Sequence, residues 1–187
     1  MILRPLDRLH ENDGFDDQSR FLLSLNDFAE RESSTLLDTI FYYWDALRGG
    51  SDKVPNVRHF ELRNVFGQNT PDPLSAVVTD TANPRNFVLV NHGTSQLGPF
   101  GADLEGKRLR DVPSVIHARA TAQEYQQCKL LRRPLYDEID QVIGGISRHY
   151  VRIMLPLAND QGDVVKIAYG IRALEPNYYM MAPEEIS

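Results

Sequence analysis

The residues of this chain that could do chemistry are its histidines, its clustered carboxylates and its single cysteine. The histidines are His10, His59, His92, His117 and His149. No two of them stand four residues apart and no His-Glu-x-x-His sequence occurs, so the usual pattern of a helical zinc site is absent. The sequence also lacks a Gly-x-x-x-x-Gly-Lys-Ser/Thr phosphate loop and a Gly-x-Ser-x-Gly nucleophile motif. We therefore expect no metal site and no catalytic residue of these kinds.

Three carboxylates lie within one predicted strand. Side chains alternate between the two faces of a strand, so Asp137 should lie on the side of Leu135 and Ile139, with Glu138 and Asp140 on the other. Glu138 and Asp140 could pair as acid and base, or they could form a solvated strand face.

The single cysteine, Cys128, limits both the covalent chemistry and the compartment. One thiol cannot form an internal disulfide, and it cannot build a cysteine-based zinc or iron–sulfur site. A reducing compartment, the cytoplasm, is the simplest location.

The composition excludes several classes of protein. The 187 residues are 42% hydrophobic and 25% charged, as expected of a globular chain and not of a disordered one, a collagen or a membrane bundle. The net charge of −6 disfavours general nucleic-acid binding, which needs a basic surface. The first residues contain no apolar run of signal-peptide length, and no window approaches the length of a membrane span. We expect neither a nucleic-acid nor a membrane partner.

Three segments of the chain are predicted to be helical. Apolar residues at Phe21, Leu22, Leu25 and Phe28 predict a helix within residues 15–31. Hydroxyl residues at 33–35 and the Gly49-Gly50 pair bound a clearer helix over residues 34–48. A further helix is predicted over residues 114–131.

Five strands are predicted after residue 73, near residues 74–80, 87–92, 135–143, 148–158 and 164–173. Period-two patterns in the last two place one set of apolar residues on a buried sheet face: Val151, Ile153, Leu155, Leu157, Val165, Ile167, Tyr169 and Ile171.

Several short motifs in this order resemble those of short bacterial single-domain PAS proteins. The first is Tyr43-Trp44-Asp45-Ala46-Leu47-Arg48-Gly49-Gly50, which resembles the opening helix of that subfamily and its glycine stop. The second is Gly93-Thr94 followed by the Phe-Gly-x-x-Leu-x-Gly-x-x-Leu run at residues 100–109. The third is Met154-Leu155-Pro156-Leu157 with the turn that follows. The resemblance covers about residues 40–174. Residues 57–60 and 91–92 depart from it, and residues 1–35 have no familiar match.

The resemblance implies an α+β fold, a five-stranded antiparallel sheet with helices on one face and an N-terminal helical extension. The last strand should lie centrally, beside the first. We divide the chain into an N-terminal extension (residues 1–32), a PAS-like domain (33–174) and a C-terminal tail (175–187).

A curved sheet capped by short helices can enclose an apolar ligand pocket, or the same residues can fill a dry core. The predicted ligand-binding residues are Val88, Val90, His92, Leu130, Leu135, Ile139, Ile153, Leu155, Ile167, Tyr169 and Ile171. Some PAS domains bind haem through one histidine, so His92 could be such a ligand or could hydrogen-bond the loop backbone. Cys128 lacks the motif of flavin-binding PAS photoreceptors. The sequence identifies no cofactor.

The resemblance implies a cytoplasmic sensory or signalling adaptor domain that binds a small ligand, a protein partner or both. The alternative is a small cone-shaped isomerase or hydratase, with His92, His149 or Asp137 supplying an acid–base pair in the cavity. A third reading is a purely structural interaction module. We also expect a homodimer, formed through the N-terminal helices and a patch around Trp44, because helix 34–48 carries more apolar surface than one sheet can cover.

Overall fold

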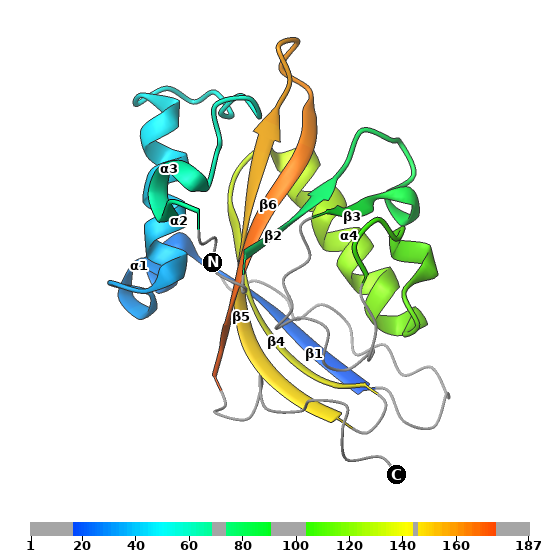
Figure 1. The fold of residues 1–187 in the computed structure, drawn as a ribbon. Helices are drawn as coiled ribbons and strands as arrows, with labels where there is room; N and C mark the ends of the chain where they lie inside the picture. The colour runs from blue at the N-terminus through cyan, green and yellow to red at the C-terminus, as the bar shows by residue number, and fades with distance from the viewer. Residues whose placement is uncertain (1–16, 69–73, 91–103, 144–145, 175–187) are drawn as a thin grey trace.

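The computed structural model describes residues 17–68, 74–90, 104–143 and 146–174 (Figure 1). In chain order, the first elements are β1 (Asp17–Leu23), α1 (Leu25–Arg31), α2 (Leu36–Arg48) and α3 (Arg63–Phe66). They are followed by β2 (Leu74–Val78), the 3-10 turn η1 (Pro84–Asn86), β3 (Val88–Val90) and the 3-10 turn η4 (Leu109–Asp111). The last elements are α4 (Val115–Leu131), β4 (Leu135–Ile143), β5 (Ile146–Ala158) and β6 (Val164–Ala173).

The strands form one antiparallel sheet in the order β1-β4-β5-β6-β2-β3. The last strand, β6, lies between β5 and β2, so the prediction that the last strand pairs with the first of the five predicted strands is confirmed. The α+β class with an antiparallel sheet is also confirmed.

The sheet has six strands, so the prediction of five was wrong. The sixth is β1, within the segment for which we predicted a helix. It pairs with β4 along its whole length, from Asp17 opposite Val142 to Leu23 opposite Tyr136. Its inward side chains include the polar Gln18 and Arg20, so the strand has no apolar alternation that reveals it. The helical part of this segment is α1, which begins only after Ser24 and is fixed there by a capping box with Asp27.

Helices cover both faces of the sheet, which corrects the expectation of helices on one face. Figure 1 shows α1, α2 and α3 on one side of the sheet and α4 on the other. Each face therefore has its own apolar core, one beneath α2 and one beneath α4.

The predicted helix at 34–48 is confirmed as α2. Thr35 accepts a hydrogen bond from the Asp38 N–H at its start, and Gly49 ends it with φ of 60°. The helix lies close to the sheet at Gly170, where an added Cβ would stand 2.7 Å from the Leu37 side chain.

Trp44 on this helix is 1% exposed, and its Nε1 donates a 2.7 Å hydrogen bond to the carbonyl oxygen of Pro156. Trp44 belongs to the core of its own chain, so it cannot form the surface patch that we predicted for a dimer. The homodimer itself stays a prediction.

None of the helices in the described part of the chain combines the length and the apolar character that crossing a membrane requires.

Candidate functional site

The structure divides the predicted ligand-binding residues between two faces of the sheet. Leu135, Ile139, Ile167, Tyr169 and Ile171 lie together in the core beneath α4. Ile153 and Leu155 lie in the opposite core beneath α2. We had placed the two groups on one buried face, and the structure corrects that placement.

A β-bulge causes this difference. Near the turn, Ala158 of β5 pairs with Val164 of β6, and continuing that register would bring Ile153 opposite Tyr169. A shift between Leu157 and Ala158 instead places Leu157 opposite Lys166 and Ile153 opposite Gly170. One extra residue in β6 therefore moves the whole apolar set of β5 to the other face.

The remaining predicted ligand-binding residues that the structure describes do not belong to either core. Val88 and Val90 are half-buried on β3, and Leu130 on α4 is 68% exposed, so Leu130 is not in the core. His92 lies outside the described residues. Ligand binding by these eleven residues stays a prediction.

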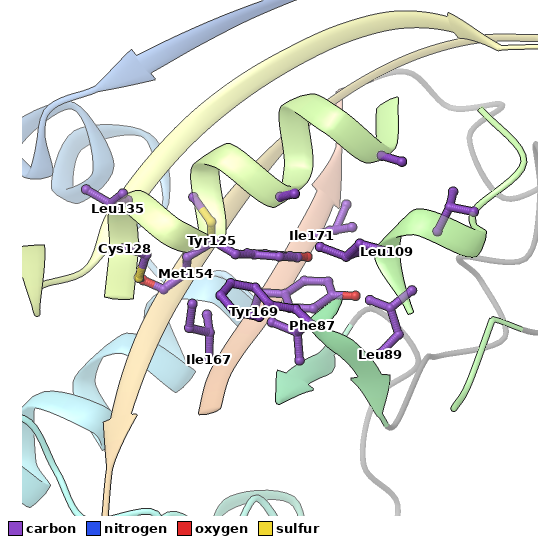
Figure 2. Packing of buried hydrophobic residues seen from close by; sticks show 14 of the residues in the cluster. Phe87, Leu89, Leu109, Tyr125, Cys128, Leu135, Met154, Ile167, Tyr169 and Ile171 are labelled. Atoms are coloured by element: carbon purple, nitrogen blue, oxygen red, sulfur yellow. The ribbon is translucent and has the colours of Figure 1, made fainter. Parts of the chain in front are cut away.

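The core beneath α4 is built around aromatic rings (Figure 2). Tyr125 of α4 faces Tyr169 of β6, with ring centroids 5.5 Å apart. Phe87, Leu109 and Ile167 pack around them, each 2% exposed or less. These contacts occupy the space between α4 and the centre of the sheet.

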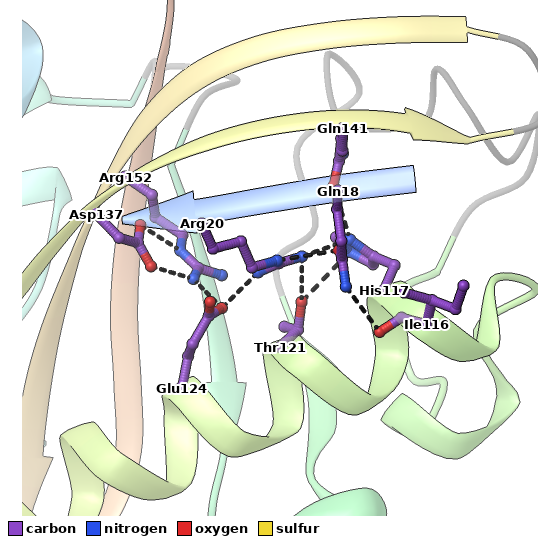
Figure 3. A network of polar contacts seen from close by, with 9 residues as sticks. All are labelled: Gln18, Arg20, Ile116, His117, Thr121, Glu124, Asp137, Gln141 and Arg152. Carbon is purple, nitrogen blue, oxygen red and sulfur yellow. Dashed lines mark hydrogen bonds and ion pairs between the residues drawn. The ribbon is translucent and has the colours of Figure 1, made fainter. Parts of the chain in front are cut away.

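Beside this apolar core, the other part of α4 covers a buried polar cluster, which we call the α4 cluster (Figure 3). It joins three parts of the chain: the N-terminal strand β1, helix α4 and the paired strands β4 and β5. Its members are Gln18, Arg20, His117, Thr121, Glu124, Asp137, Gln141 and Arg152.

Two arginines and two carboxylates form the charged half of the α4 cluster. Arg152 donates to both oxygens of Asp137, from Nε at 3.2 Å and from Nη2 at 2.5 Å. Its Nη2 also donates to Oε2 of Glu124, which accepts a second hydrogen bond from Arg20 Nη1 at 2.5 Å. All four side chains are at most 6% exposed. The two positive and two negative charges balance, as buried charges must.

His117 occupies the neutral end of the cluster. Its Nδ1 lies 2.9 Å from Nη2 of Arg20 and 3.0 Å from Oε1 of Gln141. A neutral imidazole nitrogen either donates or accepts, so Nδ1 makes one of these two bonds at a time. Burial holds the pKa of His117 well below its usual range, and the positive charges of Arg20 and Arg152 lower it further. His117 is therefore neutral at physiological pH.

Asp137 is held in an unfavourable environment despite its partner. Burial raises the pKa of Asp137 to about 6, although Arg152 opposes the shift, and the nearby charge of Glu124 adds to the rise. Both oxygens of Asp137 accept from Arg152, so the carboxylate is engaged with that guanidinium in the described structure. The cavity beside Asp137 and Glu124 has a volume of about 10 Å³, room for about one water molecule.

The other residues considered for chemistry in the sequence lie in the following environments. Asp137 lies on the side of Leu135 and Ile139 as predicted. Glu138 bonds His149 at 2.7 Å and Arg31 at 2.8 Å, whereas Asp140 is exposed, so Glu138 and Asp140 do not pair. Burial raises the pKa of the Cys128 thiol well above its usual range. Within the described ranges, no three His, Cys, Asp or Glu side chains are placed to hold a metal ion.

Sequence reasoning missed Arg20, Glu124 and Arg152. One signal was available for Arg152, which interrupts the apolar run Tyr150–Leu157 on the face that we took as the outer one. Because β5 is central and covered on both sides, that face is buried too, and a charge there requires a buried partner.

Comparison with known proteins finds similarity among solved structures. No family model and no curated protein sequence matches the chain. Among solved structures, the PAS domain of BvgS from Bordetella pertussis aligns with a TM-score of 0.44 and 15% sequence identity, over 74% of this chain and 88% of that one.

Proposed function

We propose that this chain is a PAS-type sensory or signalling adaptor domain, with no catalytic output of its own. The observation that carries the proposal is the sheet order: β6 lies between β5 and β2, as the motif resemblance implies for a PAS fold, and α4 covers one face. The motifs and the strand order are independent features of the chain that lead to the same family.

The α4 cluster gives such a domain a route for a signal. Arg20 of β1 bonds Glu124 of α4, and Glu124 bonds Arg152 in the sheet. A ligand or partner that shifts α4 must therefore break or rearrange bonds to β1. Since β1 is the most N-terminal described element, the shift would reach the N-terminal residues directly.

The enzyme alternative has less support. A cone-shaped isomerase or hydratase needs an acid–base pair that reaches a substrate. Both oxygens of Asp137 accept from Arg152, and His149 bonds Glu138, which is 24% exposed and lies outside the core beneath α4. Neither carboxylate is placed for proton transfer in a cavity of substrate size lined by described residues.

The ligand, the signalling partner, the homodimer and the cytoplasmic location are parts of this proposal. Cys128, buried and reduced, is consistent with a reducing compartment. The N-terminal helices remain the proposed dimer surface, through exposed residues such as Tyr42 instead of Trp44.

Native mass spectrometry of the full chain, freshly purified, tests the proposal because it reports the oligomer and any bound molecule together. We expect a dimer or a retained small molecule whose removal changes hydrogen exchange in both α4 and β1. A matched comparison is α2, which has no bond to the α4 cluster among the described residues and should keep its exchange rates. A monomer at tens of micromolar with no retained molecule would count against the proposal.

A further inference from the structure

A groove of about 480 Å³ lies on the face of the sheet opposite the α4 cluster. Residues of the α3 region, including Leu62 and Arg63, form one side of it. The beginnings of β2 and β6 form the other side and the floor, through Leu74, Ala76, Lys166 and Ala168. We call it the α3 groove. Its volume lies within the range of small-molecule sites, about 300–1,000 Å³.

Small, buried side chains on the strands form the floor of this space. Ala76 of β2 pairs directly with Ala168 of β6, so the two methyl groups lie side by side on the sheet. Two pairs further along, and next on the same face, Leu74 lies opposite Gly170, where α2 packs directly against the sheet. The groove is therefore the part of this face that α2 does not cover.

Lys166 lies at the other end of this floor. Its register position, opposite Val78 and Leu157, puts it on the same face as Ala168, and its side chain is partly buried. Among the described residues, its ammonium group has no hydrogen-bond or ion-pair partner. Burial accordingly lowers the pKa of Lys166. Lys129 contrasts with it, because its Nζ donates to the carbonyl oxygens of Thr79 and Thr81.

The other charges of the α3 groove cancel. Arg63 Nε donates to Oε2 of Glu61 at 2.6 Å, and both residues line the groove. Lys166 is left as one uncompensated positive charge beside an apolar floor. The complement to this arrangement is a molecule with one negative charge and an apolar body.

We propose that the α3 groove binds a small amphipathic carboxylate, with its carboxylate on Lys166 and its hydrocarbon chain against the half-buried Phe60 and Leu62. The site lies on the opposite face from the α4 cluster, and the proposal goes beyond the signalling function and does not depend on it. A carboxylate near Lys166 would supply the anion that the described structure does not, and its chain would cover apolar surface of Phe60 and Leu62.

Calorimetric titration of the full chain with decanoate and with methyl decanoate tests the charge and the chain separately. We expect decanoate to bind about tenfold more tightly than the ester, the gain from one charge-assisted contact. Lys166→Met should reduce decanoate binding to the level of the ester, because it keeps the aliphatic stem and removes the charge. Lys53→Met is the matched control, since Lys53 is exposed and away from the groove, and it should bind like the wild type.

A second measurement needs no substitution. Reductive ¹³C-methylation of the lysines allows the pKa of Lys166 to be followed by NMR, and decanoate should raise that pKa because a bound anion favours the charged form. Equal affinity for acid and ester, unchanged affinity in Lys166→Met, or no binding at ~1 mM decanoate would each overturn the proposal. A decanoate-induced shift at other lysines with none at Lys166 would also overturn it.

Discussion

Substitution of Arg152 by methionine tests the α4 cluster directly. Arg152 donates two hydrogen bonds to Asp137. Arg152 and Arg20 also both donate to Glu124. In Arg152→Met, Glu124 keeps Arg20, but Asp137 is left as a buried carboxylate at 3% exposure without its cation. Removing one partner of a buried ion pair costs about 3–5 kcal/mol, and we expect ~4 kcal/mol here.

Urea unfolding followed by circular dichroism measures this loss. With a typical slope of ~2 kcal/mol per molar urea, the midpoint should fall by ~2 M. Arg58→Met is the control, because Arg58 pairs with Asp160 at the surface, where the two side chains are 75% and 51% exposed. Exposed pairs of this kind contribute about 0–1 kcal/mol, so the control should lose little stability.

The pH dependence of the stability of Arg152→Met shows whether the unpaired Asp137 carboxylate causes the loss. The Asp137 pKa is already raised in the folded wild type, to about 6, and losing Arg152 removes the main effect that opposes the rise. The folded variant then binds a proton more readily than the unfolded chain, whose aspartate pKa is about 3.9. Relative to the wild type, the deficit should be largest above the raised Asp137 pKa of the variant and should shrink as the pH falls toward about 6. Below that pH it should level off, because Asp137 then holds a proton in both folded proteins.

Adding Asp137→Leu should recover part of the loss at pH 7, since the unpaired charge disappears with it. A midpoint within experimental error of the control, or a deficit that is independent of pH and unrelieved by the second substitution, would refute the described role of this pair.

The sequence predicted those elements whose caps, turns and apolar spacing lie within the element itself. α2 has hydroxyl and glycine caps and a clear apolar periodicity, so it was predicted nearly to the residue. β4, β5 and β6 were predicted because apolar alternation and a strong turn at residues 159–163 define them. The central position of β6 came from the motif resemblance and not from any pattern within β6 itself.

The elements that were not predicted depend on contacts distant in sequence. β1 carries Gln18 and Arg20 on its inner side, and these become plausible core residues only with Ile116 and Glu124, about a hundred residues later. The faces of Ile153 and Leu155 depend on the single bulged position near Ala158, which no apolar pattern records. Local patterns therefore predicted the strands β2 to β6 but not β1, whereas the candidate site depends on register and on charge pairing between strands and α4.

Three further predictions concern other parts of the core. His117→Gln should reduce the loss of stability on acidification below pH ~6.5, because the wild-type imidazole is held neutral when folded but takes a proton when unfolded. In the wild type this difference lowers the free energy of unfolding by about 1.4 kcal/mol per pH unit, and urea midpoints at several pH values measure it. Gly170→Ala should lower the free energy of unfolding in urea by about 1–3 kcal/mol, because the new Cβ would lie 2.7 Å from Leu37 and 2.8 Å from Ile40 in a closed core. An unchanged urea midpoint would mean that α2 is free to move away from the sheet. Cys128 should react with a thiol reagent only when the chain opens, because it is fully buried and its pKa is raised. Its reaction rate in the native protein should be at least ~1,000-fold below that in urea, and it should rise in Arg152→Met in step with the lost stability. Reaction of native Cys128 at the rate of a free thiol would contradict the packing of α4 against the sheet.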